Sequence, residues 1–136
     1  MSSRQEAAAK YQEVLKIARK TYRDRVLHGQ YPYPQVLDEI LDDSMSAGQI
    51  DMGLLEIPAN HVIGTKTQGR RDAFSADFMP LLPLDTEFAS KWITLCAAHL
   101  SDEGIREPIR CFEYLGRFYV QEGNKRVSVL DRKSVV

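Results

Sequence analysis

Two short segments near the end of the chain are rich in aromatic and β-branched residues, and a glycine-containing pair, Leu115-Gly116, separates them. The first segment spans residues 108–114 and the second spans residues 117–121. This composition is typical of β-strands, and the tight turn between the segments predicts an antiparallel hairpin. The hairpin therefore places β-structure in the C-terminal third of the chain.

Helical periodicity dominates the start of the chain and a segment in its second half. In residues 1–28, and again after Asp85 or Thr86, apolar side chains recur at steps of three and four and so share one face. Gly29 is expected to end the first helix, and Asp85 or Thr86 can cap the second. The two faces comprise Tyr11, Val14, Leu15, Ala18, Tyr22 and Val26 in the first helix and Phe88, Trp92, Leu95, Cys96 and His99 in the second.

The middle of the chain predicts a short helix, a strand and a long loop. The apolar stripe that begins at Val36 favours a helix that ends at Gly48, and residues 50–57 form an expected strand that Pro58 closes. Residues 64–83 combine glycines, prolines and basic residues, which predicts an irregular loop. We expect the aromatic side chains of this loop to attach it to the core.

Together these elements predict a single α+β domain. The 136 residues suffice for one core, and a hydrophobic fraction of 43% with a charged fraction of 27% is ordinary for a soluble protein. No apolar run approaches the roughly 20 residues that span a bilayer, and the first residues do not form a signal peptide. We therefore expect a cytoplasmic protein without membrane contact, in which Cys96 and Cys111 are buried, reduced thiols.

Charge is distributed unevenly along the chain, although the net charge is only −1. Residues 1–30 hold seven Lys or Arg against three acids, residues 31–60 hold six acids and no Lys or Arg, and residues 109–136 hold six Lys or Arg against three acids. The small net charge argues against a strong free-standing nucleic-acid binder. Either the basic ends attract a phosphate, or the oppositely charged segments pair with one another, and the sequence leaves both open.

The strongest local motif is the corner Gly123-Asn124-Lys125-Arg126, where the second hairpin strand meets a helix that we expect from Asn124 onward. The first turn of a helix presents N–H groups and the positive end of the helix dipole, which favours an anion. Gly123 lets the backbone approach a ligand closely, and Lys125 and Arg126 add charge that suits a phosphate. The alternative is an ordinary turn whose two bases pair with Glu122 or face solvent.

Residues 100–109 and 117–127 resemble the N-terminal domain of the ParB partition proteins, which is similar in fold to sulfiredoxin. The shared pattern is a helix, the segment Gly104-Ile105 to Pro108-Ile109 that leads into a strand, a hairpin, and a corner of glycine and bases that opens a helix. An upstream strand comparable to residues 54–58 precedes the first of these helices in that family.

The resemblance covers roughly residues 50–130 and implies a small mixed sheet with flanking helices. It divides the chain into an N-terminal helical pair, residues 1–49, and a ParB/sulfiredoxin-like domain, residues 50–136, on which that pair is expected to pack. Residues 1–49 have no counterpart in the family that we can assign.

The resemblance also implies that Gly123, Asn124, Lys125 and Arg126 form a corner that binds nucleotide phosphates. In ParB-type proteins this corner holds the triphosphate of CTP, and in sulfiredoxins it holds ATP and carries the catalytic cysteine. Here Asn124 stands where sulfiredoxins place that cysteine and where ParB proteins usually place a glutamate. We therefore expect a nucleoside triphosphate such as CTP or ATP, with Mg²⁺, as the ligand; we expect no sulfiredoxin chemistry and assign no catalytic residue.

A second basic segment, residues 65–71, is a candidate for the opposite wall of such a site. It lacks the spacing of a P-loop, but Thr65, Lys66, Arg70 and Arg71 supply hydroxyl and basic groups that suit a phosphate. The alternative is a solvated basic loop. No cluster of cysteine, histidine or carboxylate side chains in the sequence predicts a metal site.

Two other functions stay open. The apolar stripe of residues 5–28 can pack on a partner or on a second copy, which predicts an interaction or dimerisation module. Some ParB-like proteins are nucleases, which makes nuclease activity a further alternative.

ParB proteins continue past this corner into helices that bind DNA, whereas only ten residues follow Arg126 here. We therefore expect either a truncated fragment, whose DNA contacts lie in regions beyond this chain, or a protein without the DNA-reading part, and residues 131–136 break the apolar pattern.

Overall fold

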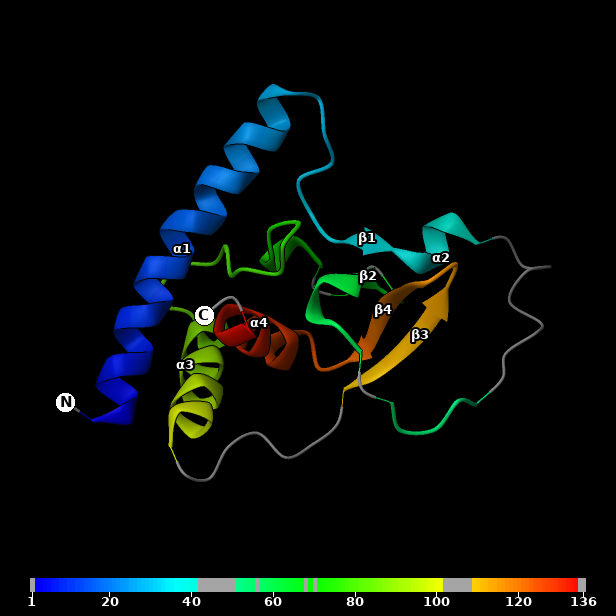
Figure 1. Cartoon of the computed structure of the whole chain (residues 1–136). Coiled ribbons are helices and arrows are strands. Elements are labelled where there is room, and N and C mark those ends of the chain that lie inside the picture. Colours follow the sequence, from blue (N-terminus) through cyan, green and yellow to red (C-terminus); the bar gives the residue numbers. More distant parts are fainter. Residues whose placement is uncertain are drawn as a thin grey trace.

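The computed structural model describes residues 2–41, 51–55, 57–67, 69, 71–101 and 109–134. These residues form an α+β fold in which a four-stranded mixed sheet lies beside several helices, including a long N-terminal helix (Figure 1). The strands are β1 (Gln35–Val36), β2 (Val62–Thr65), β3 (Arg110–Tyr114) and β4 (Arg117–Glu122). The helices are α1 (Ser3–Leu27), α2 (Leu37–Ile40), α3 (Glu87–Leu100) and α4 (Asn124–Ser134), with short 3₁₀ turns at Ala59–His61 and Arg71–Ala73.

Helix α1 begins at a reciprocal cap and packs along α3. The Ser2 hydroxyl accepts a hydrogen bond from the Gln5 backbone N–H at 3.1 Å, while the Gln5 side chain accepts one from the Ser2 N–H at 3.0 Å. The predicted apolar face is confirmed as far as Ala18, because α3 and the core cover Tyr11, Val14, Leu15 and Ala18. The part of the stripe that we considered for a partner is therefore used within the chain, and dimerisation stays a prediction.

Helix α3 lies at the centre of the helical layer, with α1 on one side and α4 on the other (Figure 1). The predicted cap at Thr86 is confirmed: its hydroxyl accepts a hydrogen bond from the Ala89 N–H at 3.1 Å. Trp92 is completely buried, and its ring meets the Tyr11 ring edge-to-face at 5.3 Å. No described helix is long and apolar enough to cross a membrane.

The sheet has the strand order β1-β2-β4-β3. β1, β2 and β4 run parallel to one another, and β3 pairs antiparallel with β4 in the predicted hairpin. Gly64 lies at the middle of this sheet, paired with Gln35 on one side and Tyr119 on the other. A Cβ atom at Gly64 would lie 2.2 Å from the Gln35 carbonyl oxygen, so only glycine lets β1 approach β2 this closely.

In its described part, the predicted helix from Val36 to Gly48 is confirmed only as the single turn Leu37–Ile40 and is wrong on either side of that turn. Val36 belongs to β1, where it pairs with Thr65, and the helix that follows is the single turn α2. Leu41 already has extended backbone, at φ −87° and ψ 143°. The sheet partner offers the β-branched Val36 a buried position, which overrides the helical periodicity. Gly48 lies outside the described residues.

The predicted strand at residues 50–57 is also wrong where the structure describes it, since residues 51–55 and Ile57 form no strand. The carboxylate of Asp51 accepts a hydrogen bond from the Gly53 N–H at 2.8 Å, and Gly53 adopts a positive φ of 71°, so the chain bends here. Leu54 is 84% exposed. The strand is instead β2, which begins in the short apolar patch at Val62.

The expectation that aromatic side chains attach the loop at residues 64–83 to the core is confirmed. Phe74 and Phe78 are almost completely buried, and the Leu81 N–H donates a hydrogen bond to the Ala73 carbonyl at 2.8 Å. The loop is shorter than predicted, because Gly64 and Thr65 belong to β2. It folds over the helical layer and carries buried side chains toward α3.

Candidate functional site

Three parallel strands end at the same edge of the sheet, and the segments that follow them gather there. β1, β2 and β4 run in the same direction, so their carboxyl ends meet at one edge, as the register of Thr65 with Val36 and Val120 shows. Ligand sites in sheets with parallel strands commonly lie at this edge. Here β4 continues through Gly123 into α4, whose first turn therefore lies at the edge.

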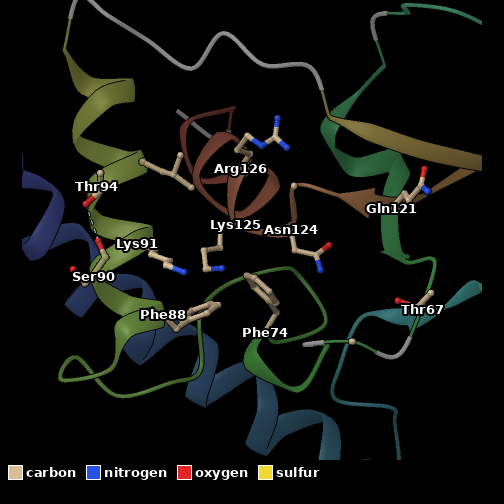
Figure 2. Close-up of a pocket in the computed structure, with 13 residues that line it drawn as sticks. Thr67, Phe74, Phe88, Ser90, Lys91, Thr94, Gln121, Asn124, Lys125 and Arg126 are labelled. Carbon is tan, nitrogen blue, oxygen red and sulfur yellow. Dashed lines mark hydrogen bonds between the residues drawn. The ribbon is translucent and has the colours of Figure 1, made fainter.

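A cleft of about 630 Å³ opens at this edge, between α3, the start of α4 and the loop after β2. Figure 2 shows its side chains arranged around an open centre. Among the described residues, the lining combines two aromatic residues and Leu95 with hydroxyl, amide and basic groups and holds no Asp or Glu: Thr67, Gly69, Phe74, Phe88, Ser90, Lys91, Thr94, Leu95, Gln121, Gly123, Asn124, Lys125 and Arg126. A volume of this size fits a small-molecule ligand.

The aromatic part of the lining is firmly packed. Phe74 and Phe88 are 1% and 2% exposed, and their rings meet edge-to-face at 5.2 Å. Both belong to the core that continues to Trp92. The aromatic wall is therefore preformed, although little of either ring is open to the cleft.

Gly123 and Arg126 form a compact unit at the start of α4. Gly123 adopts a φ of 112°, which a side chain would strain, and its carbonyl accepts the Val127 N–H at 2.9 Å. A Cβ atom on Gly123 would lie 3.0 Å from a guanidinium nitrogen of Arg126. The absence of a side chain at Gly123 therefore lets the Arg126 guanidinium fold back over the backbone, which keeps positive charge at the helix start.

Lys125 extends toward the aromatic wall. Its ammonium nitrogen lies 5.1 Å from the centroid of the Phe88 ring, within cation–π range. Lys91, on α3, adds a second ammonium group to the lining and pairs with Glu87 at 3.1 Å. That pair is largely exposed, so water screens it and Lys91 retains most of its attraction for an anion.

The amide oxygen of Asn124 is buried and has no hydrogen-bond partner among the described residues. Buried polar atoms in proteins almost always have a partner, so this oxygen is an unsatisfied acceptor at the wall of the cleft. Figure 2 shows the Asn124 side chain beside the cleft, below the strand that carries Gln121. A ligand that donates a hydrogen bond would satisfy this oxygen.

The structure brings the four residues of the predicted corner together at the cleft. Gly123, Asn124, Lys125 and Arg126 all line it, although Lys125 points toward Phe88 and Arg126 points away from Lys125 (Figure 2). Their backbone, rather than the tips of the two basic side chains, forms the point of convergence.

The second predicted group, from the loop after β2, lies elsewhere. Thr65 is buried and its hydroxyl donates a hydrogen bond to the Thr67 carbonyl at 2.7 Å. Lys66 pairs with Asp38 of α2 and lies 5.4 Å from the Phe112 ring. None of these side chains, nor that of Arg71, is among the lining residues.

A guanidinium nitrogen of Arg71 pairs with the Glu39 carboxylate of α2 at 2.8 Å. The guanidinium carbon lies 5.7 Å from the centroid of the Tyr31 ring, within cation–π range. Lys66 and Arg71 therefore pair with the acids of α2, an arrangement that neither the phosphate-binding prediction nor the solvated-loop alternative for this segment included. Arg70 lies outside the described residues. From this loop the cleft receives Thr67 and Gly69 instead.

Several lining residues escaped sequence reasoning. Ser90 and Thr94 are four residues apart on α3, and Lys91 follows Ser90. They lie on the polar side of this helix, whereas the sequence analysis considered only its apolar face. A search for hydroxyl pairs at helical spacing would have found them. No local pattern in the sequence marks Gln121 as a site residue. Its place in the lining depends on how β4 is arranged relative to the neighbouring strands.

The two cysteines, Cys96 in α3 and Cys111 in β3, are free thiols, and neither is among the lining residues of the cleft. Burial raises the pKa of both Cys96 and Cys111, which favours the unreactive thiol form. Among the described residues, no three His, Cys, Asp or Glu side chains gather as a metal site.

Comparison of the chain with protein-family models, with curated proteins and with solved structures finds no match.

Proposed function

We propose that this protein binds a phosphate-bearing small molecule, a nucleoside triphosphate such as CTP or ATP with Mg²⁺, in the cleft at the start of α4. The observation that carries the proposal is that Gly123, Asn124, Lys125 and Arg126 all line one cleft, with no acid among the described residues of its lining. The first turn of α4 contributes the positive end of its dipole at the same place.

The electrostatics of this corner favour an anion on physical grounds. Two basic residues in the first turn of α4 add their charge to the positive end of the helix dipole. A phosphate group bound between the helix start, Lys125 and Lys91 is attracted by all three. The buried amide oxygen of Asn124 adds an acceptor for a hydrogen-bond donor of the ligand, such as a hydroxyl or amino group.

The resemblance to the ParB/sulfiredoxin-like fold is part of this proposal. The order of elements from β2 onward is a strand, a helix, a hairpin and a helix. This order supports the proposal, because it is the order in the family pattern described above. The strand precedes the helix at Val62–Thr65 rather than at residues 54–58. Asn124 in place of the family's glutamate or cysteine leads us to propose binding without an assigned catalytic step.

Isothermal titration calorimetry with CTP, ATP and GTP, each with and without Mg²⁺, tests the proposal. At least one nucleotide is expected to bind more tightly than about 1 mM, and Lys125→Ala with Arg126→Ala is expected to weaken it at least about tenfold, because two charged contacts are lost. The matched control removes Lys16 and Arg23, two exposed bases on the outer side of α1. Thermal unfolding of each variant checks that the fold is retained.

Two results would overturn the proposal. One is the absence of binding tighter than millimolar for all three nucleotides. The other is equal affinity of the wild type and the Lys125/Arg126 variant, because the corner would then contribute nothing to the site.

A further inference from the structure

Helix α1 reaches the rim of the cleft through Arg4. The guanidinium of Arg4 donates a hydrogen bond to the Thr94 hydroxyl at 3.0 Å and a longer one to the Ser90 hydroxyl at 3.4 Å. Ser90 and Thr94 both line the cleft, whereas Arg4 itself does not. The contact joins residues separated by 86 and 90 positions in the sequence.

The packing of α1 holds Arg4 in this position. Arg4, Ala7 and Tyr11 follow one another at helical spacing on the same face, and Ala7 and Tyr11 are completely buried. The Tyr11 hydroxyl donates a hydrogen bond to the Leu82 carbonyl at 2.6 Å. This bond opposes sliding of α1 along its own axis, while the buried side chains hold it against α3. Arg4 is therefore the exposed continuation of a buried stripe, placed beside α3 by the core.

The hydrogen-bond roles at the rim are asymmetric. Thr94 uses its own hydrogen, because its hydroxyl donates to the Ser90 carbonyl at 3.0 Å, the bond drawn as a dashed line in Figure 2. Ser90 accepts from Arg4, so its hydroxyl hydrogen must point away from the guanidinium. Both hydroxyls that accept from Arg4 are neutral.

We propose that Arg4 is a positioning residue for the cleft: it orients the Ser90 hydroxyl as a donor toward an anionic ligand. The inference rests on the proposed function, since it concerns the same ligand. It gives the N-terminal helix, which the resemblance to ParB proteins does not cover, a part in ligand binding.

Calorimetric titration of the full chain with inorganic tripolyphosphate at an ionic strength of about 0.15 M tests the proposal. Arg4→Gln is expected to weaken binding roughly three- to fivefold, the range of an exposed charged interaction. The matched control is Lys16→Gln on the same helix, which lies about 18 Å from Arg4 along the axis and so beyond the Debye length of physiological salt. This control is expected to change the affinity by less than about 1.5-fold.

A double-mutant cycle with Ser90→Ala separates positioning from a general structural role. If Arg4 acts through Ser90, the loss caused by Arg4→Gln shrinks toward that of the control when Ser90 is already alanine. Trp92 fluorescence of each variant reports whether α1 stays docked, because Tyr11 contacts that ring.

The outcomes distinguish this inference from the proposed function. A wild type that does not bind tripolyphosphate overturns both. Binding that depends on Lys125 and Arg126 but is equal in Arg4→Gln and Lys16→Gln overturns the role of Arg4 alone. An Arg4→Gln loss that is the same with serine or alanine at position 90 also rejects positioning through Ser90.

Discussion

The indole Nε1 of Trp92 donates a hydrogen bond of 2.9 Å to the hydroxyl of Ser128, and both residues are completely buried. This bond joins α3 to α4, the two helices that form opposite sides of the candidate cleft. Apolar packing tolerates small shifts between helices, whereas a single buried hydrogen bond specifies one spacing. The pair therefore sets the width of the cleft.

Ser128→Ala is expected to destabilise the protein by about 1–3 kcal/mol, because the indole N–H then stays buried without an acceptor. Equilibrium unfolding in urea, followed by far-UV circular dichroism, measures the change. In a Trp92→Phe background the same substitution is expected to cost less, since no indole donor remains. Equal costs in both backgrounds would show that the hydrogen bond contributes nothing.

The raised pKa of the Tyr11 hydroxyl predicts that the protein loses stability in alkaline solution. Burial raises the pKa of Tyr11 to about 12, while the nearby Arg19 lowers it by a smaller amount. Above pH 10 the unfolded chain releases this proton and the folded chain retains it until about pH 12, so the free energy of unfolding falls as the pH rises between these values. The contribution is at most about 2–3 kcal/mol.

Tyr11→Phe isolates this effect. The variant loses the hydrogen bond to Leu82, which costs about 1 kcal/mol at neutral pH. Its stability is expected to decline less steeply than that of the wild type between pH 10 and 12, as measured by urea unfolding at each pH. The difference between the two proteins removes the contribution of the other tyrosines and lysines, and parallel pH profiles would contradict the assignment.

Gly64→Ala is expected to separate β1 from the sheet. The added Cβ atom would lie 2.2 Å from the Gln35 carbonyl oxygen, a backbone atom that can move only if the strand moves. The cost is expected to be about 3 kcal/mol or more, measured by thermal and urea unfolding. Gln35→Ala serves as the control, because it removes an exposed side chain at the same pair and leaves the backbone in place. Similar stability of the two variants would refute the requirement for glycine.

Gly123→Ala is expected to weaken nucleotide binding more than it weakens the fold. Its positive φ of 112° strains any side chain by about 1–2 kcal/mol, and the new methyl group would displace the Arg126 guanidinium from the helix start. Gly116→Ala is the matched control: its φ is also positive, at 81°, and its Cβ would meet no atom within 4 Å. Calorimetry should show reduced affinity for Gly123→Ala only, and an equal effect of both variants would indicate backbone strain alone.

The successes and failures of sequence reasoning follow the range of the interactions involved. The hairpin around Leu115-Gly116, the cap at Thr86 and the start of α4 after Gly123 were predictable, because turn and cap chemistry acts between residues close in the chain. Val36 and residues 51–55 were misassigned. Their apolar character was clear, but their strand or loop state depends on whether a distant strand pairs with them.

The sequence by itself determined the α+β class, the main helices, the hairpin and the corner at residues 123–126, since each follows from local periodicity and turn chemistry. Only the tertiary structure decided that Lys66 and Arg71 pair with the acids of α2 while Ser90, Lys91 and Thr94 join the corner in one cleft. The physical reason is that a cleft forms where elements distant in sequence pack side by side. Strand direction, the Trp92–Ser128 bond and the docking of α1 set that packing, and none of these is encoded in a local pattern.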